Sequence, residues 1–359
     1  MKKIPLAQLK SVSQCPYCQG TDFVKTGWRI KKHEKIQVFF CNRCQKKFTP
    51  LVTKGRTYPI SVILKALIWF NQFLEPGAIA EKIRREYGLK VVPETIVSWL
   101  KDYERFTPFS RMRQYLKIKL DNGEMDLKEM VAEQRLFHQQ IYDFKYHRFK
   151  TNCLLEEDFK NYKQKAIKDF LELIMAECPH QVFRESNVRA SEFKNIFNLD
   201  QVRITRKENR ANEMARFVMQ AVANNKERHQ AMQRFALFCD STTLACEVPV
   251  LLDKDDLDHF RLMLNFNVPL EIKRDEVITG HIDIIQLRNG LVHIMDFKPS
   301  AAKTKPVDQL TLYALALSRL TSLRLHSFKC AWFDDKDYFE FFPLHVVYKL
   351  KKKGKRLKF

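Results

Sequence analysis

The dipeptide Asn289-Gly290 is the feature that most constrains how this chain can fold. It separates two apolar runs, Val277–Leu287 and Leu291–Lys298. Asn-Gly between such runs is the strongest short signal for a β-hairpin with a two-residue type I′ turn. If these two residues form the loop, Arg288 pairs with Leu291, and every later pair along the two strands is fixed.

This register places two carboxylates opposite each other. Asp283 pairs with Asp296, and because side chains alternate between the faces of a strand, Lys298 lies on the same face. Two facing carboxylates repel, and a hard divalent cation with oxygen ligands would compensate. Carboxylates and a lysine around Mg²⁺ suit phosphodiester hydrolysis. A surface hairpin with a wet polar face is the alternative, and apolar residues on that face argue against it.

Three segments in this region together resemble the PD-(D/E)XK nuclease superfamily, in its RecB-type branch. They are Gly280-His-Ile-Asp283, Met295-Asp-Phe-Lys298 and Gln309-Leu-Thr-Leu-Tyr313. Cys246-Glu-Val-Pro249 is similar to the strand that commonly precedes them. Each motif alone is weak, but the ordered set is specific, and the resemblance covers about residues 209–348.

The resemblance implies a role for each matching residue. Asp283 and Asp296 would hold Mg²⁺ or Mn²⁺, with the backbone carbonyl of Phe297 as a further ligand. Lys298 would be the catalytic lysine. Gln309 and Tyr313, one helical turn apart, would orient the lysine and the DNA strand.

Two acidic residues are weaker candidates. Glu213 resembles the helix residue that many members use as an additional metal ligand, and a surface residue is its alternative. Glu247 can simply flank its strand. No iron–sulfur cluster is expected, because only Cys330 follows Lys298, whereas the cluster-binding members use three cysteines there.

Two CxxC pairs near the N-terminus predict a structural zinc site. Cys15 and Cys18 form the first pair, and Cys41 and Cys44 form the second. Four thiolates close a tetrahedral Zn²⁺ site and leave no open position for catalysis. The interval between the pairs predicts two strands, Phe23–Ile30 and Lys35–Phe40. Four unrelated buried cysteines are the alternative.

The next segment predicts three helices in a helix-turn-helix arrangement. They run from Pro59 to about Phe73, over Ala78–Tyr87 with Gly88 as its end, and over Pro93–Tyr103. The groove-facing candidates on the third helix are Thr95, Ser98 and Lys101. A plain three-helix bundle without a ligand is the alternative. The ribbon and these helices together resemble the N-terminal DNA-binding region of some insertion-sequence transposases.

The middle of the chain shows no chemistry by pattern. Helices are expected over Met125–Lys150 and Glu156–Cys178, His138 and His147 are interpreted as packing or surface residues, and Cys153 and Cys178 as lone thiols. The last part predicts a mixed sheet with flanking helices. Its expected helices are Asn209–Cys239 and Val307–Leu320, and its expected strands are Cys246–Leu252, Val268–Lys273, Val277–Leu287, Leu291–Lys298, Phe328–Phe333 and Tyr338–Val347.

The charge distribution favours a nucleic-acid partner. The net charge is +21, and residues 1–110 hold 20 Lys/Arg against 8 Asp/Glu. The Lys349–Lys358 tail adds phosphate contacts or is a disordered terminus, and a solvated basic surface is the alternative to a polyanion-binding one. No signal peptide or membrane span is expected, so the predicted location is the cytoplasm.

We therefore expect a multidomain α+β and α/β protein. The predicted segments are a zinc ribbon (1–55), a helix-turn-helix (56–110), a helical connecting region (111–208), a PD-(D/E)XK domain (209–348) and a basic tail (349–359). The predicted function is a Mg²⁺- or Mn²⁺-dependent DNA nuclease. A sequence-specific DNA-binding protein with a silent nuclease fold is the alternative, and a transposition protein that cuts element ends is a third. Homodimerisation and protein partners are left open.

Overall fold

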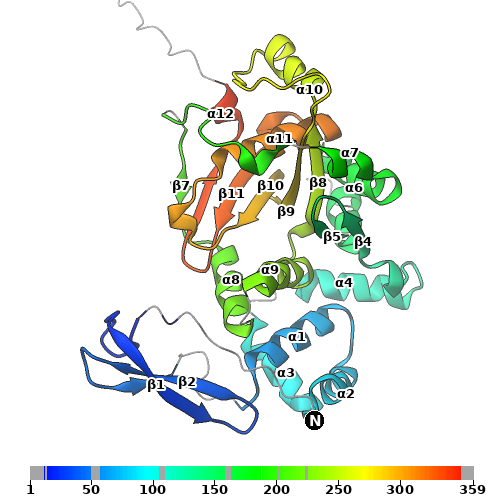
Figure 1. Cartoon of the computed structure of the whole chain (residues 1–359). Helices are drawn as coiled ribbons and strands as arrows, with labels where there is room; N and C mark the ends of the chain where they lie inside the picture. Colours follow the sequence, from blue (N-terminus) through cyan, green and yellow to red (C-terminus); the bar gives the residue numbers. More distant parts are fainter. Residues whose placement is uncertain are drawn as a thin grey trace, which may run out of the picture. The chain divides into compact units, whose positions relative to one another are not determined.

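The computed structural model describes residues 12, 14–49, 57–104, 110–157, 163–186, 188–200, 202–222 and 225–348. These residues form a mixed α/β protein with twelve helices, a large mixed sheet and a small three-stranded sheet (Figure 1). They divide into two compact units, Met1–Glu124 with Arg210–Ser241, and Met125–Asn209 with Thr242–Phe359. These units follow different boundaries from the five predicted segments, and the predicted basic tail lies outside the described residues.

The first unit begins with the predicted ribbon. Its sheet has the order β1-β2-β3, with β1 at Phe23–Ile30, β2 at Lys35–Cys41 and β3 at Lys47–Phe48. The two strands expected between the CxxC pairs are therefore confirmed. Because the ribbon core consists of little more than Phe39, Phe48 and the cysteines, it buries too little apolar surface to be stable by itself.

The rest of the first unit is helical. The bounds are α1 Ile60–Asn71, α2 Pro76–Tyr87, α3 Pro93–Asp102, α4 Ser110–Asp121, α8 Arg210–Ala221 and α9 Asn225–Cys239. The three predicted helices are confirmed, and Gly88 ends α2 in the left-handed conformation with φ +67°. Helix α2 begins at Pro76, two residues before the expected start at Ala78, because proline is well suited to the first helical position.

Helix α1 is the centre of this unit. It is buried along almost its whole length and contacts α2, α3, α8 and α9. The single helix expected over Asn209–Cys239 is two helices, and both belong to this unit instead of the sheet. An apolar helix such as α1 needs cover on all sides, and the later segment supplies it.

The second unit contains the large sheet. Its strand order is β4-β5-β8-β9-β10-β11-β12-β7, with β6 paired to β9, and β10 runs parallel to β11 while β9 and β10 are antiparallel. The strands are β4 Ala132–Phe137, β5 Ile141–Tyr146, β6 Val188–Arg189, β7 Thr205–Arg206, β8 Thr243–Leu252, β9 Ile278–Arg288, β10 Leu291–Phe297, β11 Phe328–Phe333 and β12 Tyr338–Phe341. The helices are α5 Arg148–Asn152, α6 Lys165–Glu177, α7 His180–Glu185, α10 Lys254–Asp258, α11 Val307–Thr321 and α12 Leu344–Val347.

Three expectations for this region are wrong. Met125–Lys150 contains the β4–β5 hairpin instead of a helix, because Leu136, Phe144 and Tyr146 bury one side of a ribbon that pairs with the edge of β8. Val268–Lys273 is an irregular segment, and only the first part of Tyr338–Val347 is a strand, followed by α12. The expected strands at β8, β9, β10 and β11 and the expected helix α11 are confirmed within a few residues.

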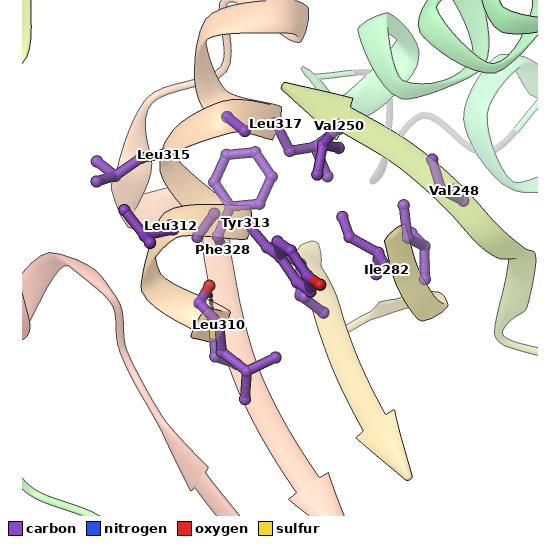
Figure 2. Close-up of a cluster of buried hydrophobic side chains, with 14 of the residues drawn as sticks. Val248, Val250, Ile282, Leu310, Leu312, Tyr313, Leu315, Leu317 and Phe328 are labelled. Carbon is purple, nitrogen blue, oxygen red and sulfur yellow. Dashed lines mark hydrogen bonds between the residues drawn. The ribbon is translucent and has the colours of Figure 1, made fainter. Parts of the chain in front are cut away.

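Helix α11 packs on the sheet and is buried at most of its positions. Figure 2 shows Tyr313 and Leu317 of α11 on the side of the helix that faces the strand side chains Val250 and Ile282. This packing fixes how far Tyr313 extends toward β9, which positions part of the site described next. None of the described helices is long and apolar enough to cross a membrane.

Candidate functional site

The β9–β10 hairpin has the register that the Asn-Gly turn predicts. Arg288 pairs with Leu291, and the ladder continues without a shift to the pair of Ile284 with Met295. The next positions along the two strands are Asp283 and Asp296. Asp283 Oδ2 accepts a hydrogen bond from the backbone N–H of Phe297 at 3.0 Å, so this carboxylate is held against the neighbouring strand.

Asp296 is a buried carboxyl group with an unusual environment. Its side chain is 4% exposed, and burial, followed by the charge of Asp283, raises its pKa well above the ordinary value. Asp296 Oδ2 faces one cation, the Lys298 ammonium. A single ammonium does not balance two neighbouring buried carboxylates, and a bound divalent cation would do so.

Lys298 supplies the positive charge that lies nearest to the two carboxylates. Its Nζ lies 2.9 Å from Asp296 Oδ2. Burial alone would lower the Lys298 pKa, but the charges of Asp296 and Asp283 raise it above the ordinary value. Lys298 is therefore an ammonium group here. The carboxylate oxygens of Asp283 and Asp296 that attract it would also attract a metal cation.

Gln309 and Tyr313 lie on α11 and contact each other. Gln309 Nε2 donates a hydrogen bond to the Tyr313 hydroxyl at 2.9 Å. Tyr313 is buried, and burial, together with the nearby carboxylates Asp283 and Asp296, raises its pKa. A Cβ at Gly280 would overlap the Tyr313 ring, so only glycine at this position of β9 lets the ring approach the strand.

Glu247 belongs to the site more clearly than its sequence suggested. On β8 it lies between Cys246, which pairs with Ile284, and Val248, which pairs with Ile282. Its position is therefore across from Asp283, and carboxylate oxygens of the two residues lie within 4.8 Å of each other. Glu247 has a left-handed backbone with φ +53°, a conformation that non-glycine residues rarely adopt inside a strand.

Three neighbouring strands thus each carry one carboxylate of the candidate site. Glu247 comes from β8, Asp283 from β9 and Asp296 from β10. In the sequence, the segment Glu247-Val-Pro249 before the hairpin was the signal that could have identified Glu247 as a stronger candidate ligand. Glu213 is exposed in the first turn of α8, which belongs to the other unit, and its role as a ligand stays a prediction.

The four cysteines of the ribbon form a cluster that could bind a metal such as zinc. Cys15 Sγ lies 3.6 Å from Cys44 Sγ, and Cys18 Sγ lies 3.6 Å from Cys41 Sγ. The two CxxC turns are built alike, because each is followed by a glutamine with a left-handed backbone, Gln19 at φ +59° and Gln45 at φ +56°.

The pKa values of two of these thiols differ widely. Burial would raise the Cys15 pKa, but hydrogen bonds from the backbone of Tyr17 and Cys18 lower it to about 7. Burial and the neighbouring thiols raise the Cys44 pKa to about 12. Sulfurs this close cannot all ionise without a cation, so the donor set fits Zn²⁺, which binds as it displaces the thiol protons.

The predicted DNA-contact residues lie on the outward side of α3. Ser98 and Lys101 are exposed and Thr95 is partly exposed, while Ile96 and Trp99 are buried in the helical core. This burial pattern leaves the three polar side chains available to a ligand. Contact with nucleic acid stays a prediction.

Two residues without a predicted role are found together. His138 and Cys178, interpreted as a packing or surface residue and a lone thiol, lie next to His180 in the second unit. Cys178 is a free thiol, but it has two histidines beside it, because the turn after β4 and the end of α6 meet there. Sequence spacing could not show this, since the two segments are far apart along the chain.

Comparison with known proteins found no relative of this chain. The chain matches no protein-family profile, no curated protein and no solved structure.

Proposed function

We propose that this protein is a Mg²⁺- or Mn²⁺-dependent nuclease that hydrolyses phosphodiester bonds in DNA. The observation that carries the proposal is the placement of Glu247, Asp283 and Asp296 on three adjacent strands. Carboxylate oxygens of Glu247 and Asp283 lie within 4.8 Å of each other, and the Lys298 ammonium lies 2.9 Å from the buried Asp296. Such a concentration of like charge in a packed sheet is destabilising by itself. It is therefore typical of a site that holds a metal and acts on a charged substrate.

The residues present fit a hard divalent cation. Asp296 and Asp283, with the backbone carbonyl of Phe297, would hold the ion, and Glu247 would add a further oxygen. When bound, Mg²⁺ polarises a phosphodiester and lowers the pKa of its water. Since the ion would then neutralise both carboxylates, Lys298 would lose the charges that raise its pKa and would more easily take part in proton transfer.

Gln309 and Tyr313 would position the lysine and the DNA strand. Their mutual hydrogen bond and the close approach of Tyr313 to Gly280 hold both side chains on the α11 side of β9. Neither group has a pKa suited to proton transfer near neutrality, because glutamine does not titrate and the Tyr313 pKa is raised. Their proposed part is therefore orientation.

The N-terminal unit would bring DNA to this site. A zinc-stabilised ribbon, an exposed polar face on α3 and the excess of basic residues in residues 1–110 support this part of the proposal. The rival is a sequence-specific DNA-binding protein with a silent nuclease fold. The same features of the N-terminal unit favour it, and the retained carboxylates and lysine favour the enzyme.

A cleavage assay separates the two functions. The full-length protein is incubated with circular and linear, single- and double-stranded DNA, and with RNA, in Mg²⁺ or Mn²⁺. We expect metal-dependent cleavage of DNA that Asp296→Asn abolishes and that Asp275→Asn, an exposed carboxylate of the same unit, leaves unchanged. Cleavage of circles identifies an endonuclease. DNA binding without cleavage of any substrate would overturn the enzyme proposal in favour of the rival.

A further inference from the structure

A second set of nitrogen and sulfur ligands lies in the large-sheet unit. His138 is in the turn between β4 and β5, and Cys178 and His180 flank Pro179 at the junction of α6 and α7. One ligand atom of each residue lies within 4.8 Å of the others. His138 Nε2 is 3.2 Å from His180 Nδ1 and 3.9 Å from Cys178 Sγ. Two segments distant in sequence thus present an imidazole, a thiol and an imidazole to one point.

The junction between α6 and α7 is shaped to present its two side chains together. Pro179 has φ −76° and ψ +66°, and the His180 N–H donates a hydrogen bond to the Cys178 carbonyl at 2.8 Å. These values define an inverse γ-turn, the tightest common reversal of a chain. Because the turn spans a single residue, Cys178 and His180 are held side by side, and proline fixes the φ angle that the turn needs.

His138 is held from behind by neighbouring rings. Its Nδ1 lies 2.8 Å from Nε2 of His281, which is buried, and its ring stacks on Phe183 at 4.4 Å between centroids. His281 in turn stacks on Tyr142 at 3.5 Å. If His138 Nδ1–H donates to His281, the lone pair on its Nε2 faces Cys178 and His180, which is the tautomer a metal ligand needs.

We propose that His138 Nε2, Cys178 Sγ and His180 Nδ1 form a second transition-metal site, of the zinc class. Imidazole and thiolate ligands select Zn²⁺ over hard cations such as Mg²⁺. Three protein ligands leave a fourth position for water or another small ligand, in contrast to the closed four-cysteine set. All three ligand residues are partly exposed, so an ion can reach them from solvent.

The site would connect the outer part of the sheet to the carboxylate cluster. A metal on His138 Nε2 fixes that ring, and its Nδ1 contacts His281, which precedes Asp283 by two residues on β9. The partner behind a ligating histidine orients its ring; it is commonly a carboxylate, a backbone carbonyl or a water, and here His281 Nε2 takes that place. The expected role is to fasten the β4–β5 turn and the α6–α7 junction beside β9. The proposal does not depend on whether the carboxylates hydrolyse DNA.

The metal content of the purified full-length protein tests this site. After removal of loosely bound ions, we expect two Zn²⁺ per wild-type chain by elemental analysis. Cys178→Ser, His180→Ala and Cys41→Ser should each retain one, and Cys41→Ser combined with His180→Ala should retain none. His326→Ala and Cys153→Ser, a histidine and a cysteine outside both clusters, should retain two.

Cobalt spectra separate the two sites without relying on stoichiometry alone. In the Co²⁺-loaded protein the second site contributes one thiolate and the ribbon contributes four, so His180→Ala should remove the smaller part of the thiolate-to-cobalt absorption. His180→Gln keeps a polar side chain and serves if the alanine variant unfolds, as judged by circular dichroism. One zinc per wild-type chain, or two in folded Cys178→Ser and His180→Gln proteins, would overturn the proposal.

Discussion

The two candidate metal centres are built in opposite ways. In the ribbon, four sulfurs lie in two short local turns, and the surrounding core is a few aromatic side chains. In the large sheet, Glu247, Asp283 and Asp296 come from separate strands of an extensive apolar core. We therefore expect the ribbon to need a bound metal to stay folded. The clustered carboxylates of the sheet, by contrast, lower its stability, and a bound metal would remove that penalty. The first arrangement stabilises the protein, and the second is typical of function.

The largest expected effect is the loss of DNA cleavage when the carboxylate site of the large sheet is changed. Asp296→Asn should abolish hydrolysis by weakening metal binding, and Lys298→Ala should cost roughly 10²–10⁴-fold in rate while DNA and metal binding persist. Single-turnover cleavage and Mn²⁺ binding separate the two variants. Asp283 and Asp296 form one site, so we expect the double variant to be little worse than either single one. Near-wild-type cleavage by either aspartate variant would break the assignment.

Loss of the ribbon metal should unfold the ribbon without unfolding the sheet. Cys41→Ser removes one of four thiolates, and a core as small as Phe39 and Phe48 cannot compensate. Limited proteolysis with mass spectrometry should place new cleavages within residues 14–49. The sheet of the second unit should keep its thermal transition, with Cys153→Ser as the control. Protection of the ribbon in the zinc-free variant would contradict the comparison.

Gly280→Ala should disturb the sheet through Tyr313. The new methyl group would overlap the ring, and overpacking of this kind typically costs about 1–3 kcal/mol of unfolding free energy. Gly77→Ala is the matched control, because a Cβ there contacts nothing within 4 Å. Denaturant unfolding measures both. If Tyr313 is the cause, the cost should shrink when Gly280→Ala is combined with Tyr313→Ala, and an undiminished cost would exclude this explanation.

The pH dependence of stability should reveal the carboxylate penalty. The Asp296 pKa is raised in the folded protein, so the stability that its protonated form contributes is present below its ordinary value of 3.8 and is lost as the pH rises through the folded value. Asp296→Asn removes this loss. In unfolding experiments without metal, we expect the free energy of unfolding of the variant to rise relative to that of wild type as the pH increases from about 4 to 8. Mg²⁺ should reduce the difference in unfolding free energy between the variant and wild type at pH 8. A difference that does not change with pH would contradict the proposed carboxylate penalty.

Buried histidines, His138 and His281 among them, produce the opposite pH dependence of stability, and comparing the variant with wild type cancels it. Burial lowers the pKa of His138 to about 4 and that of His281 to about 2, both from an ordinary value of 6.5. The unfolded chain binds these protons more tightly, so both proteins should lose stability as the pH falls below 6.5. Only the difference between wild type and Asp296→Asn therefore reports on the carboxylate.

The smallest effect concerns DNA affinity. Lys101→Ala should weaken binding about equally on all sequences and reduce the log–log salt slope by about 1. Ser98→Ala, a neighbouring exposed position, should leave the slope unchanged. Point variants are preferable to deletion of residues 1–110, since α1 packs on α8 and α9 of the same unit and its removal would expose their apolar faces. An unchanged slope in Lys101→Ala would move the DNA contact elsewhere.

Local chemistry determined much of this protein in advance. The turn at Asn289-Gly290 was enough to place Asp296 one step beyond Met295, which pairs with Ile284, because a two-residue turn leaves no freedom of register. The CxxC spacing did the same for the four cysteines, and Gly88 for the end of α2. Each of these features depends on residues that are adjacent in sequence or joined by a single tight turn.

Only the tertiary structure decided the features that depend on distant neighbours. Met125–Lys150 has an apolar pattern that fits a helix, yet its β4–β5 hairpin gains backbone hydrogen bonds at the edge of β8. Residues 210–239 pack in the N-terminal unit and not on the sheet, because they cover the apolar surface of α1. Glu247 across from Asp283, and His138 beside Cys178, became visible in the same way. Hydrophobic burial is non-directional, so a sequence shows which residues must be covered, and the assembled fold shows by what.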